Sequence, residues 1–214
     1  MKTYLTCLLF LPLAAAAGDF VNLTFDQPDL TGSLTPIYPG GPLSGNVAQI
    51  LKGWTVRLDG IPQSRMYYSP YPLTSVAPVG LIENSPANAA TPLGKHTLYL
   101  ESFPTSIPAP EIRLSQTGTV PANAAGLWVA SAGYVQMFIN HQKIEDPRIG
   151  TFGNVVVDIS GYAGQEVNLE FLVRREDSIR FDIFGFTSVP EPSTYALFGV
   201  GAALLWWHRR HRSR

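Results

Sequence analysis

Few side chains in this sequence could carry out acid, base or nucleophilic chemistry. Between residues 18 and 188 histidine occurs only as His96 and His141, and neither has a catalytic partner close by in the sequence. The Gly-x-Ser-x-Gly elbow, the His-Glu-x-x-His motif and a phosphate-binding Gly-rich loop are all missing from the sequence. A Ser-His-Asp triad could still assemble in space, because it needs no local spacing. The sequence nevertheless favours a protein that is not an enzyme.

Three tyrosines, Tyr67, Tyr68 and Tyr71, are the candidates for binding a ligand. They cluster in a proline-rich stretch, and aromatic rings stack on the flat C–H faces of sugars. We therefore predict carbohydrate contact there, with rings that cover the edge of the core as the alternative. Trp54 and Trp128 lie within strand patterns and are predicted to be core residues.

Paired carboxylates offer a weaker indication of catalysis. Glu145-Asp146 and Glu176-Asp177 lie in expected loops, where solvated charge is the ordinary explanation. A glycosidase needs two carboxyl groups that face each other across a cleft, and nothing in the sequence locates such a pair.

The elements that must position these residues are predicted to be strands. Apolar residues alternate with polar ones over 155–159 and 167–173, on either side of a Ser-Gly-Tyr-Ala-Gly turn. Residues 126–131 and 134–140 are expected to form a strand pair around Ala132-Gly133, and residues 140–142 a turn. Residues 180–187 form the last expected strand.

The first half is less regular. Residues 20–25 alternate and are predicted to start the sandwich, residues 27–45 are read as a surface loop, and residues 49–58 as a strand. Prolines interrupt residues 61–93, so loops and short edge strands are expected there. Residues 96–101 read as a strand again. No convincing helix is expected between residues 18 and 188.

The N-terminus reads as a secretory signal peptide. Lys2 precedes a short apolar run that ends in Ala14 to Ala17, so cleavage is expected after Ala17, with Ala15 and Ala17 as the small residues that the peptidase requires. Cys7, the only cysteine, lies inside the apolar run. The mature chain is therefore expected to have no disulfide and no cysteine metal site.

The C-terminus combines a turn, an apolar segment and a basic cluster. Pro190-Glu191-Pro192 disfavours both helix and sheet, and the apolar stretch 193–207 follows it. Four arginines come last, among them Arg209 and Arg210, and they place the C-terminus on the cytoplasmic side. At 15 residues the apolar stretch is short for a stable membrane span, which suits a transient anchor.

Residues 18–188 are predicted to form one domain. They contain 10 basic and 15 acidic residues, a net charge near −5. This charge argues against nucleic acid or an anionic membrane surface as a partner.

The order of Pro-Glu-Pro, apolar helix and arginine cluster over 189–214 resembles the PEP-CTERM sorting signal of Gram-negative bacteria. The resemblance implies export and recognition by an exosortase, a membrane-embedded cysteine transpeptidase that cleaves near Pro190, Glu191 and Pro192. It also implies delivery to the cell surface or the extracellular matrix, with association with exopolysaccharide. An ordinary membrane anchor is the alternative.

Residues 18–188 resemble the galactose-binding-like jelly rolls. The residues that carry this likeness are Gly53 to Val56, Ile112 to Thr117, Val157 to Gln165 and Phe181 to Phe186. Related jelly rolls often hold a calcium ion between the first and last strands, which makes Asp26 and Asp182 the candidate ligands, with solvent-facing acids as the alternative. The expected fold is an antiparallel β-sandwich.

Together these features predict an exported surface or biofilm-matrix protein associated with exopolysaccharide. A carbohydrate-binding adhesion module is the first alternative, and a polysaccharide hydrolase is the second.

Overall fold

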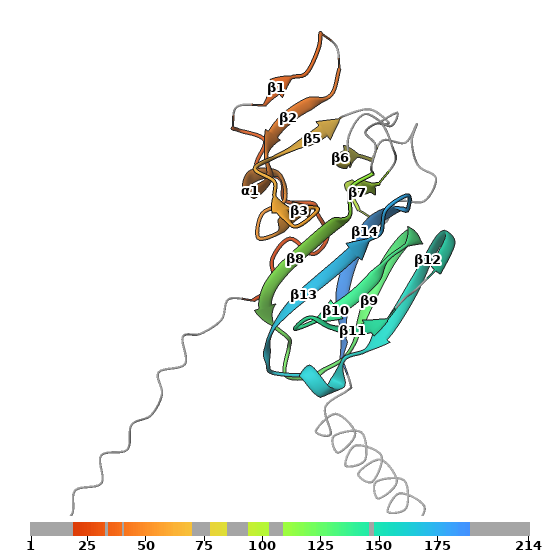
Figure 1. Ribbon diagram of the computed structural model, residues 1–214. Coiled ribbons are helices and arrows are strands. Elements are labelled where there is room, and N and C mark those ends of the chain that lie inside the picture. Colours follow the sequence, from red (N-terminus) through yellow and green to blue (C-terminus); the bar gives the residue numbers. More distant parts are fainter. Residues whose placement is uncertain are drawn as a thin grey trace, which may run out of the picture.

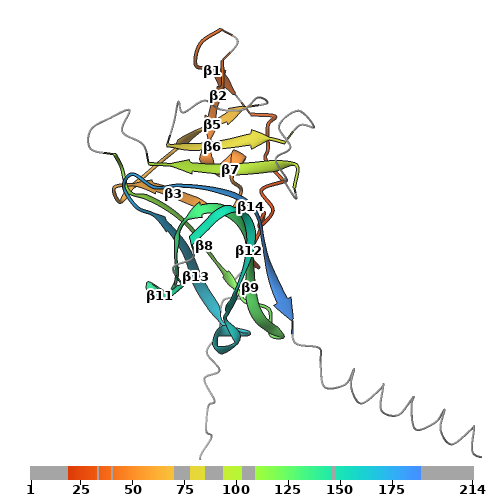
Figure 2. The same ribbon diagram turned by 90° about the vertical axis from the view of Figure 1, so that its right-hand side faces the viewer.

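The computed structural model describes residues 19–32, 34–39, 41–69, 78–84, 94–102, 109–145 and 148–188. Strands dominate these residues and form two sheets (Figures 1 and 2), so the predicted all-β sandwich is confirmed. Helix in these ranges is limited to α1 (Val47–Ile50) and the 3₁₀ turn η1 (Ser160–Tyr162). No helix in the described ranges is long and apolar enough to cross a bilayer. The predicted signal peptide and tail helix lie outside these ranges.

The larger sheet has eight strands, and their order in the sheet differs from their order in the sequence. From one edge to the other they are β1 (Thr35–Pro36), β2 (Leu43–Asn46), β5 (Arg65–Ser69), β6 (Val79–Glu83), β7 (His96–Glu101), β14 (Ser178–Ser188), β9 (Ala124–Tyr134) and β12 (Arg148–Asp158). All neighbours are antiparallel except β5 and β6, which run parallel.

The smaller sheet has six strands, all antiparallel. Their order is β11 (Gln142–Glu145), β10 (Gln136–Ile139), β13 (Glu166–Val173), β8 (Ile112–Thr119), β3 (Thr55–Leu58) and β4 (Ile61–Pro62). The long strands β8 and β13 pair over eight residues each, which fixes the register of this sheet.

Aromatic rings from both sheets fill the space between them. Phe171 of β13 stacks on Phe184 of β14 with ring centroids 4.5 Å apart, and Phe181, Trp54 and Phe25 surround this pair. Phe25, Phe171 and Phe181 have no exposed surface, and Trp54 is 3% exposed. Trp54 is therefore a core residue, as predicted.

Trp128 differs from its prediction. Leu127 and Val129, its neighbours in β9, are fully buried, so the alternation of the strand directs Trp128 to the outer face, where it is half-buried. A strand pattern alone did not decide which face of the strand pointed inward.

Two predicted elements are also wrong in pairing or type. The strands expected to pair around Ala132-Gly133 belong to different sheets, because the chain crosses from β9 to β10 at Val135. Residues 20–25 form no strand; Asn22 and Phe25 both have positive φ, which breaks the extended conformation.

The proline-rich first half contains more sheet than expected. Strands β5 and β6 lie in the interior of the eight-stranded sheet, between β2 and β7, and are not edge strands. The predicted surface loop 27–45 includes β1 and the start of β2, and the predicted strand 49–58 begins in α1 and becomes β3 only at Thr55. The strands predicted at 96–101 and 180–187 are confirmed as β7 and β14.

Candidate functional site

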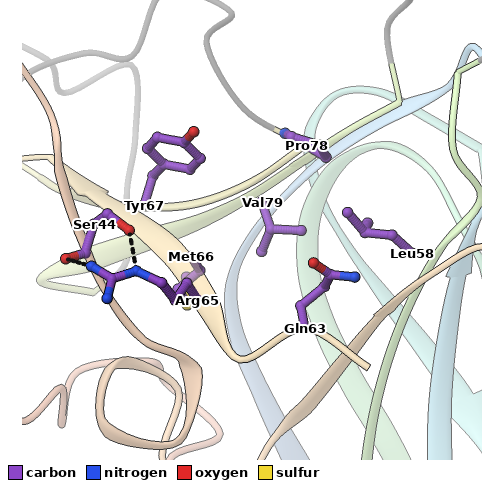
Figure 3. A pocket seen from close by; sticks show the side chains of 8 residues that line it. All are labelled: Ser44, Leu58, Gln63, Arg65, Met66, Tyr67, Pro78 and Val79. Atoms are coloured by element: carbon purple, nitrogen blue, oxygen red, sulfur yellow. Dashed lines mark hydrogen bonds between the residues drawn. The ribbon is translucent and has the colours of Figure 1, made fainter. Parts of the chain in front are cut away.

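A pocket of about 320 Å³ opens where β5 meets the β3–β4 hairpin and the start of β6 (Figure 3). Eight described residues line it: Ser44, Leu58, Gln63, Arg65, Met66, Tyr67, Pro78 and Val79. Four of them are apolar, and the others supply a hydroxyl, an amide, a guanidinium and a phenol ring. This volume lies near the lower end of the range for small-molecule sites, which is about 300 to 1,000 Å³.

A tight hairpin positions one wall of the pocket. Asp59 and Gly60 join β3 to β4 with φ of 48° and 80°, the backbone of a type I′ turn. Arg57 donates a hydrogen bond to the carbonyl of Gly60, which holds the turn closed. The backbone N–H of Gln63 donates to the carbonyl of Val56 at 2.9 Å and fixes this residue beside the pocket.

The opposite wall comes from β2 and β5, where Ser44 lies in register with Tyr67. Arg65 donates from Nε to Oγ of Ser44 and from Nη2 to its carbonyl, both at 3.0 Å, as the dashed lines in Figure 3 show. These bonds hold the guanidinium in place at the surface. An arginine has five N–H donors. Within the described part of the chain these two bonds use two of them, so the other donors of Arg65 can bind a ligand.

Of the two predicted carbohydrate-binding tyrosines in the described ranges, Tyr67 lines the pocket, where it is half-buried, and Tyr68 does not. Tyr68 is 5% exposed because the alternation of β5 turns its ring toward the core. Its hydroxyl donates to Oε2 of Glu83 at 3.1 Å, and burial, with the charge of Glu83, raises the pKa of Tyr68 to about 12. Tyr68 therefore matches the alternative interpretation, a ring that packs on the core. Tyr71 lies outside the described residues.

Both predicted calcium ligands contact the start of β7. Oδ1 of Asp26 accepts hydrogen bonds from the backbone N–H groups of Lys95 and His96, at 2.7 and 3.0 Å. Asp182 is fully buried, and its Oδ1 accepts from Oγ1 of Thr97 at 2.6 Å. Asp182 is thus not the solvent-facing acid of the alternative reading.

Within the described ranges, no group of three or more His, Cys, Asp or Glu side chains is arranged to hold a metal ion. Calcium at Asp26 and Asp182 stays a prediction.

The two histidines lie in different sheets. His141 is exposed in the β10–β11 turn, with φ of 64°. His96 is 7% exposed in β7, and burial lowers its pKa, although the nearby carboxylate of Asp26 opposes the shift. Nδ1 of His96 lies 3.5 Å from Oδ1 of Asp26, and no hydrogen bond to Nδ1 is present in the described part of the chain.

Sequence reasoning missed most of the pocket. Asp59-Gly60 between two short apolar and polar alternations is a strong hairpin signal, and it would have brought Leu58 and Gln63 together. The lining residues of β2 and β6 are separated from β5 in the sequence by turns and loops. No local pattern marks them.

The predicted processing residues Pro190, Glu191, Pro192, Arg209 and Arg210, and the cleavage residues Ala15 and Ala17, lie outside the described ranges. Residues 188–210 nevertheless match the model of the PEP-CTERM protein-sorting motif. The predicted motif is confirmed, and it indicates an exported protein that an exosortase processes at the membrane. No curated protein matches the chain.

This chain is similar, at low sequence identity, to several solved structures, three of which follow. The module TmCBM61 in complex with β-1,4-galactotriose is 13% identical, with a TM-score of 0.43, over 81% of this chain and 100% of that one. The carbohydrate-binding module CBM36 in complex with calcium and xylotriose is 14% identical, with a TM-score of 0.29, over 46% and 84%. The enzymatically active domain of bacteriophage CBA120 tailspike protein 4 is 12% identical, with a TM-score of 0.36, over 64% and 20%. At these values the three structures establish neither a ligand nor an activity for this chain.

Proposed function

We propose that this chain, which carries a PEP-CTERM protein-sorting motif, is a non-enzymatic protein of the cell surface or matrix whose sandwich binds carbohydrate. The observation that carries the proposal is the pocket at β5, which Tyr67 lines together with apolar residues and hydrogen-bonding groups. The ligand is an envelope glycan, with exopolysaccharide as the natural candidate for an exported protein.

The pocket has the chemical character that a sugar requires. A sugar ring presents C–H faces that pack on an aromatic ring or on apolar side chains, and hydroxyl groups that both donate and accept. Tyr67, Leu58 and Pro78, which are all half-buried, supply the apolar surface. The amide of Gln63 can donate and accept, and the guanidinium of Arg65 donates to oxygen atoms.

The lining favours binding over hydrolysis. None of the eight described lining residues is an aspartate, a glutamate or a histidine. Glycoside hydrolysis in most families uses two carboxyl groups on either side of the scissile bond. The eight residues therefore suit a module that holds a polymer without cleaving it.

A retention experiment tests the proposal. Residues 18–188 are passed over columns of purified exopolysaccharide from the producing strain and of neutral and acidic reference polysaccharides. We expect retention on at least one polymer and a loss of affinity of about tenfold in Tyr67→Ala, which corresponds to about 1.4 kcal/mol. Retention of the wild-type body on no polymer would reject the binding proposal.

Tyr38→Ala is the matched control. Tyr38 is 50% exposed and is not among the described residues that line the pocket, so its removal should leave retention unchanged. Equal losses in both variants would point to nonspecific aromatic adsorption and would contradict a site at Tyr67.

A further inference from the structure

The last strand of the sandwich runs directly into the sorting motif. Ser188, the last residue of β14, is still in register with Ala124 of β9, and the matched motif begins at the same residue. Only Val189 separates Ser188 from Pro190. An extended chain advances at most about 3.6 Å per residue, so the Cα of Glu191 is within about 11 Å of that of Ser188.

The end of β14 is firmly held, so it cannot lengthen this connection at low cost. It pairs with β9 from Ile179 to Ser188, and the backbone N–H of Phe184 donates to the carbonyl of Leu23 on the other side. Phe184 itself is 2% exposed in the aromatic core. Unravelling several residues of β14 would break sheet hydrogen bonds and expose core rings.

Two turns surround the point where β14 ends. The turn 120–124 and the segment 160–165 are joined by hydrogen bonds from the Val120 N–H to the Gln165 carbonyl (2.9 Å) and from the Gly164 N–H to the Val120 carbonyl (3.0 Å). We call the exposed residues of these turns the terminal face: Pro121, Ala122, Asn123, Ser160, Gly161, Gly164 and Gln165.

The two segments that form and flank the terminal face carry charge of one sign. Asp158 and Glu166, at the ends of β12 and β13, are both exposed, and residues 119–126 and 158–168 contain no lysine or arginine. Such a surface is not attracted to anionic lipid headgroups, and it complements a basic protein surface.

We propose that the terminal face is a docking surface for the membrane-embedded exosortase, which contacts it through a basic rim around the active site. An enzyme that holds Glu191 in its active site necessarily meets a folded body whose last strand ends within about 11 Å. Recognition then includes the surface of the sandwich as well as the motif. This inference rests on the sorting motif and is independent of the carbohydrate pocket.

The test combines surface substitutions with a spacer in the full-length chain, expressed in cells that contain the exosortase. Ala122→Trp adds bulk to the terminal face, and Glu166→Lys reverses a charge beside it. Each is made with the native connection and with a Gly-Ser spacer of about ten residues after Ser188, which adds a root-mean-square reach of about 18 Å. Pulse-chase labelling measures the rate at which the tail is removed.

We expect both substitutions to slow processing by about tenfold or more with the native connection, because small displacements of a reacting segment cost up to about a hundredfold in rate. With the spacer the enzyme reaches the motif without contacting the terminal face, so both variants should be processed at the rate of the wild-type chain that carries the same spacer. A variant that stays slower than this spacer-bearing wild type, as a misfolded one would, would reject the proposal.

Ile61→Trp is the matched control. Ile61 is 66% exposed on the β3–β4 hairpin, which lies beside Ile112 at the other end of β8 from Thr119. It should be processed at the wild-type rate, as should Tyr67→Ala. Wild-type rates for Ala122→Trp and Glu166→Lys with the native connection would overturn the proposal.

Discussion

His96 is a buried histidine that makes the free energy of unfolding depend on pH. Its ring is buried beside Tyr68, with centroids 6.1 Å apart, and the charged groups around it are Asp26, Glu83 and Lys95. Burial lowers the pKa of His96 below its ordinary value of 6.5, and the two carboxylates only oppose this shift. The folded protein therefore binds a proton at this site less readily than the unfolded chain does.

This shift predicts a loss of stability on mild acidification. Below about pH 6.5 the unfolded chain takes up a proton at His96 that the folded state resists, so the free energy of unfolding falls as the pH falls. Urea unfolding of residues 18–188 between about pH 7.5 and pH 5.5 measures it. In His96→Gln the decrease should be smaller, whereas His141→Gln, at an exposed turn, should behave as the wild type does. A wild-type pH dependence in His96→Gln would contradict the assignment.

Residue types in the sequence identified the candidates but not their environments. Tyr67 and Tyr68 are adjacent, and only the direction of β5 decides that the first reaches the pocket and the second the core. Asp182 reads as an ordinary strand acid, yet the bulge between Phe181 and Ile183 accompanies its burial against Thr97. The burial and the partners of these side chains depend on contacts between residues distant in the sequence, so they cannot be predicted from the residue type alone.

At the scale of elements, the segment 19–25 is held by side chains instead of by a strand ladder. The amide of Gln116 accepts from the backbone N–H of Val21 and donates to its carbonyl, both at 3.0 Å. Trp54 donates from Nε1 to the carbonyl of Asn22 at 3.3 Å. Phe25 reaches the core through this arrangement. The apolar residues that alternate over 20–25 include Phe20, which packs on Phe186, and Phe25, which packs on Trp54 and Phe184. Their spacing does not reflect a strand.

Replacing Gln116 with Met should therefore release the segment. Gln116 is 4% exposed, and the substitution keeps its approximate volume but removes both bonds to Val21. We expect a loss of about 1 to 2 kcal/mol in the free energy of unfolding, measured in urea, and faster proteolysis near Val21. Gln142→Met, at an exposed position in β11, is the control. Equal stability of Gln116→Met and the wild type would show that the amide is dispensable.

The strands that sequence reasoning located share long, regular alternation. In β13 Val167, Leu169, Phe171 and Val173 are all buried, and their spacing is visible without any structure. The strands that it misjudged are short or contain proline, and β5 and β6 become interior strands only through their parallel pairing. The parallel direction in which two strands pair leaves no local signature in the sequence of either strand.

At the scale of the molecule, the pocket and the C-terminal end of β14 lie toward opposite ends of the described part of the chain. Figures 1 and 2 both show the C-terminal end of β14 away from β1, β2 and β5. The register agrees, since the β3–β4 hairpin beside the pocket lies at the Ile112 end of β8, and Glu166 pairs with Thr119 at the other end. A body attached through the end of β14 would therefore present its pocket outward.

This arrangement predicts that binding depends on the point of attachment. Residues 18–188 contain no cysteine, so a single added cysteine gives one defined linkage to a bead. Attachment through a cysteine placed after Ser188 should preserve retention of the polysaccharide that the soluble body binds. Attachment through Ile61→Cys, two residues from Gln63 of the pocket lining, should reduce it by about tenfold, because the bead then obstructs the pocket mouth.

The measurement is the amount of labelled polymer bound per mole of immobilised protein. Equal capture through both linkages would mean that the polymer binds elsewhere on the sandwich, and poorer capture through the Ser188 end would place the binding surface at the terminal face.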